Sequence, residues 1–387
     1  MIFSPKCGII NIIFFDTNPK EKYIMSFVVT NKKKCCVVGA TGMVGQRFIT
    51  LLANHPWFEI TALVASGRTA GKTYEEAVSG RWKMAVDIPE LCRKMIVLDS
   101  ANVDEVASKV DFVFCAVNMD KAQILALEEA YAKAELPVVS NNSANRWTPD
   151  VPMVIPEINP EHLAVIEDQK KRLGTKRGFI AVKPNCSIQS YVPAITPLLK
   201  FDPEVIIATT YQAISGAGKT FNEWPEMVDN VIPYISGEEL KSEQEPLKIW
   251  GTYSNGVIEK AASPLITTQC IRVPVSDGHT AAVFVKFAKK PTKEDILKAW
   301  DEYEGPCGKL PSSPDKFVTY FEEDNRPQAR LDRDIYNGMG ITVGRLREDS
   351  YFDYKFVGLS HNTLRGAAGG AVLIAELLTK QGYITKK

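Results

Sequence analysis

Histidine is scarce in this sequence, and its cysteines form no paired motif. Only four histidines occur among 387 residues, and none of the eight cysteines stands in a C-x-x-C pair. Zinc sites and disulfide frameworks depend on such clusters, so we expect no metal centre and a reducing compartment, the cytoplasm. If the chemistry requires an imidazole, the candidates are His55, His162, His279 and His361.

Net charge and long apolar runs are also missing. The 46 basic and 46 acidic side chains balance, so there is no electrostatic reason to expect binding to nucleic acid or to an anionic membrane. The apolar stretch at residues 7–15 is too short to span a bilayer. Because a second methionine, Met25, stands just before the first expected strand, we interpret residues 1–33 as an extension: a disordered tail, an upstream-start artefact or a weak targeting peptide.

The chain does contain two distinct patterns of secondary structure. Its length and its hydrophobic fraction of 45% predict two domains. In residues 34–157, short apolar runs alternate with amphipathic helices, which predicts an α/β fold with a Rossmann-type parallel sheet, completed by a helix in residues 361–387. Residues 158–360 carry longer strands of alternating polarity, which predict a mixed α+β domain whose sheet is exposed or covered by another subunit.

A glycine-rich turn follows the first expected strand. In GATGMVG, Gly39, Gly42 and Gly45 are spaced three residues apart, ahead of a helix. Glycines at such a junction allow a tight turn and let a pyrophosphate approach the N-terminus of the helix. A purely structural turn is the alternative, but the strand, turn and helix context favours dinucleotide binding.

The loop after the second expected strand indicates which dinucleotide is bound. An NAD site normally carries an acidic residue there for the ribose hydroxyls, but this chain has ASGRTAGK. Its hydroxyl and basic side chains suit a 2′-phosphate and so predict NADP; they are Ser66, Arg68, Thr69 and Lys72. A solvated basic loop without a ligand is the alternative.

A second glycine-rich segment, AISGAGKT at residues 213–220, nearly matches the phosphate-binding pattern G-x-x-x-x-G-K-[ST]. Ala213 replaces the first glycine, and no acidic residue ends a following strand to hold magnesium. A nucleoside triphosphatase is therefore disfavoured. We expect the glycines to shape a loop that carries Gln212 toward a thiol.

That thiol belongs to Cys186, which KPNCSIQS places between a short buried strand at residues 178–182 and a partly helical segment, residues 187–200. Free cysteines are usually buried and inert. At the N-terminus of a helix, however, a thiol faces exposed N–H groups that favour the thiolate and lower the pKa. We therefore interpret Cys186 as a candidate nucleophile.

A histidine and an arginine are expected near one another. The strand-like segments at residues 265–273 and 279–287 flank the turn signal PVSDG, which predicts a hairpin or a tight strand connection. Either connection brings Arg272 and His279 to one end of a sheet. His279 alone could be a structural histidine, but beside a free thiol it becomes a candidate acid and base.

A pair of opposite charges is expected on one helix. Glu238 and Lys241 lie three residues apart in SGEELKSE and therefore share a face. Such a pair is usually a surface ion pair. It also offers an anion and a cation to a zwitterionic or phosphorylated substrate.

Together, these motifs resemble the aspartate-β-semialdehyde dehydrogenases of the archaeal and fungal-like branch, from about residue 34 to residue 378. GATGMVGQRF resembles the cofactor loop of the family, SGRTAGKTY its 2′-phosphate loop, and PNCSIQ its nucleophile motif. YQAISGAGK, EELK and RVPVSDGH resemble its substrate-contacting segments, and NTLRGAAGGAVLIAELL resembles its closing cofactor-side helix. His361 and residues 1–24 depart from the pattern.

The resemblance implies a role for each matching residue. The implied catalytic residues are Cys186 as nucleophile and His279 as acid and base. The implied substrate-binding residues are Arg146, Asn185, Gln212, Glu238, Lys241 and Arg272, of which Arg146 and Lys241 bind phosphate. The implied cofactor-binding residues are Gly39, Thr41, Gly42, Met43, Val44, Gly45, Ser66, Arg68, Thr69, Ser215, Gly216, Asn362 and Thr363.

By the same resemblance, the chain is expected to use NADPH to convert L-aspartyl-4-phosphate into L-aspartate 4-semialdehyde and inorganic phosphate through a cysteine thioester. This reaction serves the biosynthesis of lysine, threonine, methionine and isoleucine, and residues 158–360 would form the catalytic and dimerisation domain of a homodimer or homotetramer. Two alternatives stay open. An acyl-CoA reductase of the malonyl-CoA type would release CoA instead of phosphate, and an NADP-sensing protein would have a merely structural thiol.

Overall fold

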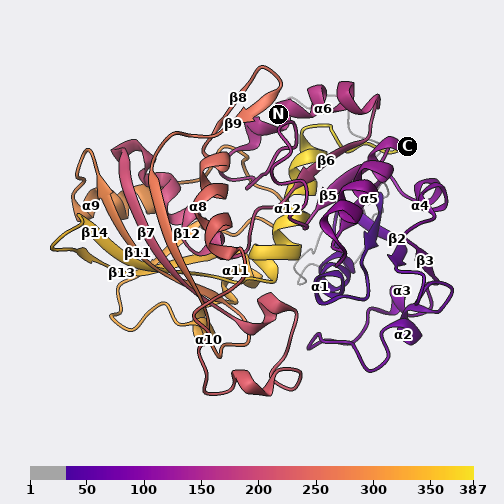
Figure 1. The fold of residues 1–387 in the computed structure, drawn as a ribbon, viewed down its shortest axis with the longest axis horizontal. Coiled ribbons are helices and arrows are strands. Elements are labelled where there is room, and N and C mark those ends of the chain that lie inside the picture. The colour runs from indigo at the N-terminus through magenta and orange to yellow at the C-terminus, as the bar shows by residue number, and fades with distance from the viewer. Residues whose placement is uncertain (1–31) are drawn as a thin grey trace, which may run out of the picture.

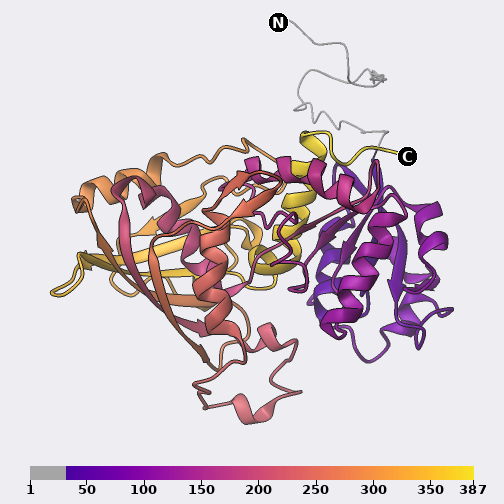
Figure 2. The ribbon, with the colours of Figure 1, turned by 45° about the horizontal axis from the view of Figure 1, so that its top comes forward.

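Two six-stranded sheets organise the chain in the computed structural model, which describes residues 32–387 (Figure 1). The first sheet is built from the earlier strands of the chain, β1 to β6, and lies in one half of the molecule. The second sheet is built from later strands and lies in the other half (Figure 2). The expectation for residues 1–31 lies outside the described residues, and the first strand begins at Lys33. No helix within residues 32–387 has the length and apolar character needed to cross a membrane.

The first sheet is parallel throughout, in the order β3-β2-β1-β4-β5-β6. Its strands are β1 (Lys33–Val38), β2 (Phe58–Ala65), β3 (Val97–Asp99), β4 (Phe112–Cys115), β5 (Pro137–Ser140) and β6 (Phe179–Val182). The central strands are buried apolar runs, because helices cover both faces of such a sheet. This confirms the predicted Rossmann-type sheet. Its last strand, β6, lies beyond residue 157, where we had expected the N-terminal part of this domain to end.

Helices surround the first sheet. They are α1 (Met43–Leu52), α2 (Tyr74–Ala77), α3 (Glu90–Arg93), α4 (Val103–Lys109), α5 (Lys121–Lys133), the 3₁₀ segment Pro160–Val165, α6 (Ile166–Leu173) and α12 (Gly369–Lys380). A single π turn, Leu364–Ala368, leads into α12. The helix α12 is apolar and buried over nearly its whole length, and it lies between the first sheet and the second domain (Figures 1 and 2).

The second sheet is mixed, in the order β10-β7-β11-β14-β13-β12. Its strands are β7 (Pro203–Gln212), β10 (Leu265–Arg272), β11 (His279–Phe287), β12 (Val318–Phe321), β13 (Ile341–Glu348) and β14 (Tyr354–Ser360). Of the two connections predicted for these strands, the hairpin is wrong, because β7 lies between β10 and β11 and pairs with both. The short strand connection is present, since β10 ends at Arg272 and β11 begins at His279. The connection after β10 crosses the end of β7, where Val273 N–H donates to the Gln212 carbonyl and Ile214 N–H donates to the Val275 carbonyl.

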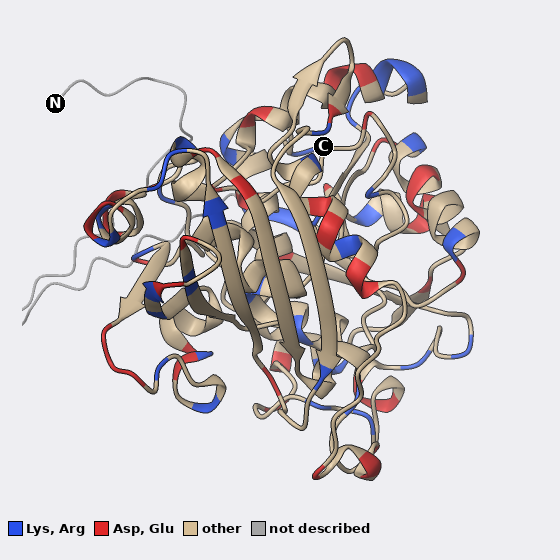
Figure 3. Cartoon of the chain, turned by 60° about the vertical axis from the view of Figure 1, so that its left-hand side comes forward, with Lys and Arg blue, Asp and Glu red and all other residues tan. Residues whose placement is uncertain are grey.

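One face of the second sheet is covered by helical segments, and the other is open. The helical segments of this domain are the 3₁₀ turns Ser187–Ser190, Thr196–Phe201, Ile214–Ala217 and Pro225–Met227 and the helices α7 (Val192–Ile195), α8 (Glu238–Ile249), α9 (Lys293–Glu302), α10 (Ala329–Asp332) and α11 (Ile335–Gly338). A small hairpin joins β8 (Thr252–Ser254) to β9 (Val257–Glu259). On the covered face, Ile195 and Leu198 share a core with Val283 and Phe356. Figure 3 looks onto the open face, where the strands carry few charges.

Candidate active site

The thiol of Cys186 is held on a tight turn at the end of β6. The Asn185 side chain shapes the turn, because its Oδ1 accepts the Ser187 N–H at 2.7 Å. The Asn185 N–H is in turn anchored to Glu245 Oε2 at 2.6 Å. On the other side the thiol packs against Gly366, where an added Cβ would lie 2.8 Å from the Cys186 Cβ. The cysteine is therefore fixed in place while remaining partly exposed.

The imidazole of His279 lies beside this thiol. Its Nε2 lies 3.5 Å from the Cys186 Sγ, and its Nδ1 accepts the Ala213 N–H at 3.0 Å. Since Nδ1 accepts a backbone N–H, the neutral imidazole must carry its proton on Nε2, which faces the sulfur. An added Cβ on Gly216 would lie 2.8 Å from Arg272 Nη1 and 3.3 Å from His279 Nε2, so a side chain there would crowd both groups.

His279 is held in the neutral form. Burial lowers its pKa well below the usual value, and the charges of Arg272 and His361 lower it further. The ring therefore enters the reaction as an uncharged donor at Nε2.

The expected lowering of the Cys186 pKa is wrong. Burial raises the pKa of this thiol, and Glu238 raises it further, against the opposing effects of Lys183, Arg146 and Arg272. The thiolate must therefore obtain its stability from nearby cations.

The helix dipole supplies little help because the segment after Cys186 is not one helix. It is broken into Ser187–Ser190, Val192–Ile195 and Thr196–Phe201. Pro193 and Pro197 each stand in the first turn of a new piece, because proline has no N–H to continue the preceding helix. Such short pieces cannot build up the aligned dipole that the sequence prediction assumed.

The predicted pair on α8 is present and points into the site. Lys241 Nζ donates to Glu238 Oε1 at 2.8 Å, while Asn185 Nδ2 and Gln212 Nε2 donate to the same carboxylate. Burial raises the pKa of Glu238, but Lys241 and these hydrogen bonds outweigh it, so that the pKa lies below its usual value. Gln212 ends β7, and its hydrogen bond to Glu238 joins it to the carboxylate that Asn185 also binds.

Both predicted arginines lie close to the nucleophile loop. Arg272 ends β10 beside His279, as predicted, and its Nη1 donates to the Ala213 carbonyl at 2.6 Å. Arg146 donates from Nε to the Lys183 carbonyl at 3.0 Å and from Nη1 to Glu245 Oε1 at 2.9 Å. The two guanidinium groups therefore supply positive charge at the edge of the site.

The glycine loop between β1 and α1 fits a bound pyrophosphate. Gly39 has a φ of +90°, and an added Cβ would lie 2.2 Å from the Ala116 carbonyl oxygen, so only glycine fits there. An added Cβ on Gly45 would lie 2.2 Å from the Gly39 carbonyl oxygen. Gly42 is exposed at the N-terminus of α1, where N–H groups are free to bind an anion. The remaining predicted contacts on this turn are Thr41, Met43 and Val44.

Two buried polar atoms at the same edge of the first sheet have no hydrogen-bond partner among the described residues. They are Arg47 Nε on α1 and Asn141 Oδ1 directly after β5. Buried polar atoms normally have a hydrogen-bond partner, so a polar ligand at this edge of the sheet would supply the missing partners of both atoms. The residues present therefore fit a dinucleotide.

The loop after β2 carries the predicted 2′-phosphate contacts in accessible positions. Ser66 and Arg68 are exposed, and Thr69 donates from its N–H to the Ser66 carbonyl at 3.0 Å. The sequence analysis did not consider Asp99, whose Oδ2 lies 2.9 Å from the position of an added Cβ on Gly67. This carboxylate sets a limit on how close an anionic group can come to the Gly67 side of the loop.

The C-terminal contacts link the two domains at the site. Asn362 donates from Nδ2 to Ser215 Oγ at 2.8 Å and accepts the Gly278 N–H at 2.8 Å. His361, which departs from the family pattern, is buried and accepts the Thr363 N–H at Nδ1. Burial lowers the pKa of His361 to about 4, so it is a neutral structural acceptor.

Sequence reasoning missed Glu245 and Lys183. Glu245 is fully buried and joins Arg146 to the Asn185 N–H. It stands seven residues after Glu238 on α8, so helical periodicity could have placed both carboxylates on one face. Lys183 carries no such signal, because nothing in KPNC shows that the ammonium is buried.

Most of the chain matches known protein families and known sequences. Residues 34–166 match the family described as semialdehyde dehydrogenase, NAD binding domain, and residues 195–365 match the semialdehyde dehydrogenase dimerisation domain. An aspartate-semialdehyde dehydrogenase from Archaeoglobus fulgidus is 45% identical over 350 residues, which cover 90% of this chain and 98% of the relative. The relative from Saccharomyces cerevisiae is 42% identical and covers 92% of this chain and 100% of its own length.

Solved structures show the same fold. The aspartate semialdehyde dehydrogenase from Candida albicans, crystallised with NADP, superposes with a TM-score of 0.82 at 41% identity, covering 92% of this chain and 100% of that chain. Aspartate semialdehyde dehydrogenase II from Vibrio cholerae, complexed with ASA, has a TM-score of 0.71 at 25% identity, covering 91% of this chain and 100% of that chain.

Proposed function

Since this chain belongs to the semialdehyde dehydrogenase family, we propose that it acts as an aspartate-semialdehyde dehydrogenase. It converts L-aspartyl-4-phosphate and NADPH into L-aspartate 4-semialdehyde, inorganic phosphate and NADP, for the biosynthesis of lysine, threonine, methionine and isoleucine. The observation that carries the proposal is the Cys186–His279 pair at 3.5 Å, with the charged pair of α8 beside it.

In the first half of the reaction, the Cys186 thiolate attacks the acyl carbon of the substrate. A carbon–sulfur bond forms, the bond from that carbon to the phosphate oxygen breaks, and phosphate leaves, so the product is a thioester on Cys186. Arg146 and Lys241 lie at the edges of the site and are proposed to hold the phosphate group.

In the second half, NADPH supplies the hydride that reduces the thioester carbonyl. His279 holds its proton on Nε2, on the side that faces Sγ, and is therefore placed to protonate the oxygen that becomes negative. As the thiohemiacetal collapses, its hydroxyl proton returns to His279 Nε2, the carbonyl forms again and the carbon–sulfur bond breaks, which releases the aldehyde and restores the thiolate. The cofactor loop residues from Gly39 to Gly45, the 2′-phosphate loop and the segment around Asn362 would hold NADPH.

The amino-acid end of the substrate requires recognition of both charges. Arg272 offers a planar fork to the α-carboxylate, and Glu238 offers a carboxylate to the α-ammonium. Asn185 and Gln212 hold Glu238 by hydrogen bonds and so keep this carboxylate in position. Lys241 and Glu238 form an ion pair in the structure. Substrate binding must therefore separate them, so that Glu238 binds the α-ammonium and Lys241 binds the phosphate.

The reverse reaction tests the proposal. With aspartate semialdehyde and NADP, NADPH should appear only when inorganic phosphate is present, and arsenate should replace phosphate. Turnover that requires CoA and ignores phosphate would instead identify an acyl-CoA reductase. The relatives from Archaeoglobus fulgidus, Saccharomyces cerevisiae and Candida albicans are all named aspartate-semialdehyde dehydrogenases. Absence of turnover in both assays would leave the non-enzymatic interpretation.

We also propose that the protein works as a homodimer or homotetramer in the cytoplasm. The match to a dimerisation domain and the open, weakly charged face of the second sheet support self-association (Figure 3). The seven cysteines among the described residues are all free, which suits a reducing compartment.

A further inference from the structure

Glu245 is a buried carboxylate of α8 to which the mechanism above gives no role. Its side chain is fully buried, and its two oxygens have different partners. Oε1 accepts a hydrogen bond from Arg146 Nη1 at 2.9 Å, and Oε2 accepts the Asn185 N–H at 2.6 Å. One partner is a proposed phosphate ligand, and the other directly precedes Cys186. Glu245 therefore connects the phosphate end of the site with the nucleophile turn, residues 185–187.

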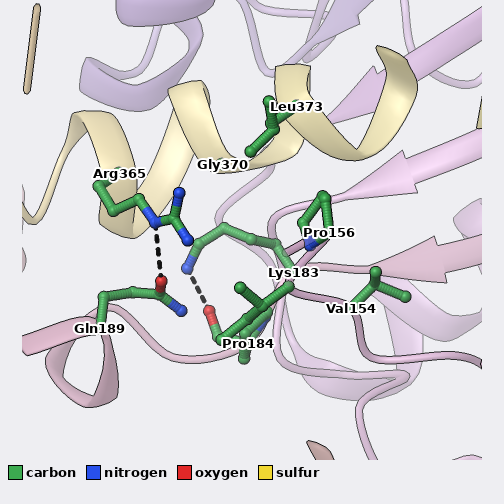
Figure 4. A pocket seen from close by; sticks show the side chains of 9 residues that line it. Val154, Pro156, Lys183, Pro184, Gln189, Arg365, Gly370 and Leu373 are labelled. Carbon is green, nitrogen blue, oxygen red and sulfur yellow. Dashed lines mark hydrogen bonds between the residues drawn. The ribbon is translucent and has the colours of Figure 1, made fainter. Parts of the chain in front are cut away.

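A second buried carboxylate shows how an ion pair with a single partner looks in this fold. Glu157 is 3% exposed and gives both oxygens to one guanidinium, that of Arg365, at 2.6 and 3.0 Å. Figure 4 shows this arginine in the segment that leads into α12, where its Nε also donates to Gln189 Oε1. All the guanidinium nitrogens of Arg365 are thus bonded inside the protein. Glu245 and Arg146 form no such pair, because the second oxygen of Glu245 binds a backbone N–H.

The guanidinium of Arg146 is held along one edge. Its Nε donates to the Lys183 carbonyl at 3.0 Å, and its Nη1 donates to Glu245. Its Nη2 donates to none of residues 32–387, although Arg146 is only 6% exposed. Because a guanidinium is planar and rigid, bonds at Nε and Nη1 also fix the direction of Nη2. The remaining edge is therefore held in one orientation, as bidentate binding of an oxyanion requires.

Helix α8 also holds the nucleophile turn on both sides of the thiol. Glu245 binds the Asn185 backbone, and Glu238 accepts a hydrogen bond from Asn185 Nδ2 at 3.1 Å. On the other side, Ser187 Oγ lies 3.0 Å from Ser242 Oγ. These three residues of α8 are spaced three or four apart and therefore share one face. The helix is a common support for the turn, and Glu245 extends this support to the arginine at the phosphate end.

We propose that Glu245 is a positioning residue that fixes the guanidinium of Arg146 relative to the Cys186 thiol. An acyl phosphate is then held with its phosphate group at Arg146 and its carbonyl carbon at the sulfur. Glu245 itself acts through its two protein partners and not by contact with the reacting atoms. The inference deepens the proposed function and rests on it for the identity of the substrate.

The length of the glutamate side chain is essential to this role. Both partners of Glu245 are hydrogen-bond donors, so each of its oxygens must accept. Aspartate keeps the negative charge but is shorter by a methylene group, and it cannot reach both donors from the same helix. A change in phosphate binding in Glu245→Asp would therefore report the position of Arg146 and not a change in the charge of the site.

The test measures how inorganic phosphate slows the alkylation of Cys186 by iodoacetamide, in the full chain without substrate or cofactor. Mass spectrometry of the modified peptide gives the rate, and the quantity compared is the phosphate concentration that halves this rate. In Glu245→Asp this concentration should rise about tenfold, because the free edge of Arg146 is no longer held in one orientation.

Glu157→Asp is the matched control. It shortens an equally buried carboxylate by the same group and disturbs a pair formed with Arg365 instead of Arg146. Both variants should be less stable to heat than wild type, but Glu157→Asp should keep the wild-type phosphate concentration. The inference would be overturned by a wild type that phosphate does not protect, by equal concentrations for wild type and Glu245→Asp, or by an equal rise in Glu157→Asp.

A double variant shows whether Glu245 acts through Arg146. Arg146→Lys keeps the positive charge but removes the planar fork that Glu245 orients. When Glu245→Asp is added to Arg146→Lys, the phosphate concentration should rise by less than about twofold, because no fork is left to orient. A further rise of about tenfold would show that the two residues act independently and would refute the inference.

A crystal structure of the wild type with bound phosphate covers a Glu245→Asp protein that does not fold. Arg146 should bind the phosphate through Nη2 and keep Nη1 on Glu245. Phosphate bound away from Arg146, or Arg146 released from Glu245, would contradict the inference. None of these measurements needs turnover, so a failed dehydrogenase assay would refute the proposed reaction and leave these results standing.

Discussion

Cys186 is held by its neighbours more than by its own helix. Asn185, Ser187 and Gly366 fix the turn, and nearby cations oppose the rise in pKa that burial causes. A serine would fit the same space, but its hydroxyl has no comparable population of anion near neutral pH. The function of this residue therefore depends on the sulfur and on its charge partners.

We expect Cys186→Ser to lower kcat by at least about 10³-fold while leaving NADP affinity and thermal stability close to wild type. Steady-state kinetics, cofactor titration and a thermal melt measure the three quantities. A variant that retains more than about a tenth of the wild-type kcat would remove Cys186 from the role of nucleophile.

The second residue-scale prediction concerns His279, which faces Sγ with Nε2. In His279→Asn, kcat should fall by about 10²- to 10⁴-fold, the usual range for loss of a general acid or base. The KM for the semialdehyde should change little in comparison. If kcat were unchanged and only KM rose, His279 would be a binding residue.

Lys241 can be tested apart from the amino-acid end of the substrate. In the reverse reaction, Lys241→Ala should raise the KM for phosphate more than the KM for the semialdehyde, because it removes one of two cations proposed to hold phosphate. Lys171→Ala is a matched control, since Lys171 also pairs with the acid three residues earlier on its helix but is exposed. An equal rise in both KM values would place Lys241 at the amino-acid end.

At the scale of elements, the cofactor site is assembled by two loops at the carboxyl edge of the first sheet. The turn between β1 and α1 must be glycine-rich, since Gly39 and Gly45 leave no room for a Cβ. The loop after β2 carries Ser66 and Arg68 in exposed positions. The first loop suits any dinucleotide, whereas the second distinguishes a 2′-phosphate from a hydroxyl.

We therefore expect wild type to use NADP with a much higher kcat/KM than NAD, and Arg68→Ala to reduce that preference at least about tenfold by weakening NADP alone. The measurement is kcat/KM with each cofactor for both proteins. Lys72→Ala tests whether the preference for NADP depends on Arg68 itself or on any positive charge in the loop. Equal kcat/KM values for the two cofactors in wild type would contradict the 2′-phosphate interpretation.

At the scale of the whole molecule, the open face of the second sheet is one of the surfaces that expose large apolar side chains. Leu265 on β10 is 68% exposed and Tyr211 on β7 is 38% exposed, and their strands are adjacent. Exposed apolar side chains gathered on one face commonly mark a subunit interface.

We expect the double variant Leu265→Asp with Tyr211→Asp to lower the molar mass of the proposed oligomer, measured by light scattering after size-exclusion chromatography, because buried unpaired carboxylates oppose association. Tyr351→Asp is the control: this tyrosine is 85% exposed in the connection between β13 and β14, and its variant should keep the wild-type mass. An unchanged mass for the double variant would place the interface elsewhere.

The amino-acid sequence by itself determined the features that depend on local pattern. The strand and helix alternation, the glycine turn at Gly39 and the helix that pairs Glu238 with Lys241 were all predicted correctly, because each follows from residue spacing within one segment. The meeting of Arg272 and His279 was also predicted, although for a partly wrong reason. The two strands are not neighbours, but β10 ends and β11 begins at the same edge of the sheet, because β7 between them is parallel to β10 and antiparallel to β11.

Only the tertiary structure decided what depends on distant partners. It placed β7 between β10 and β11, because strand order follows from long-range packing and not from the turn signal alone. It also reversed the expected direction of the Cys186 pKa, since burial and the charges of other elements outweigh the local dipole.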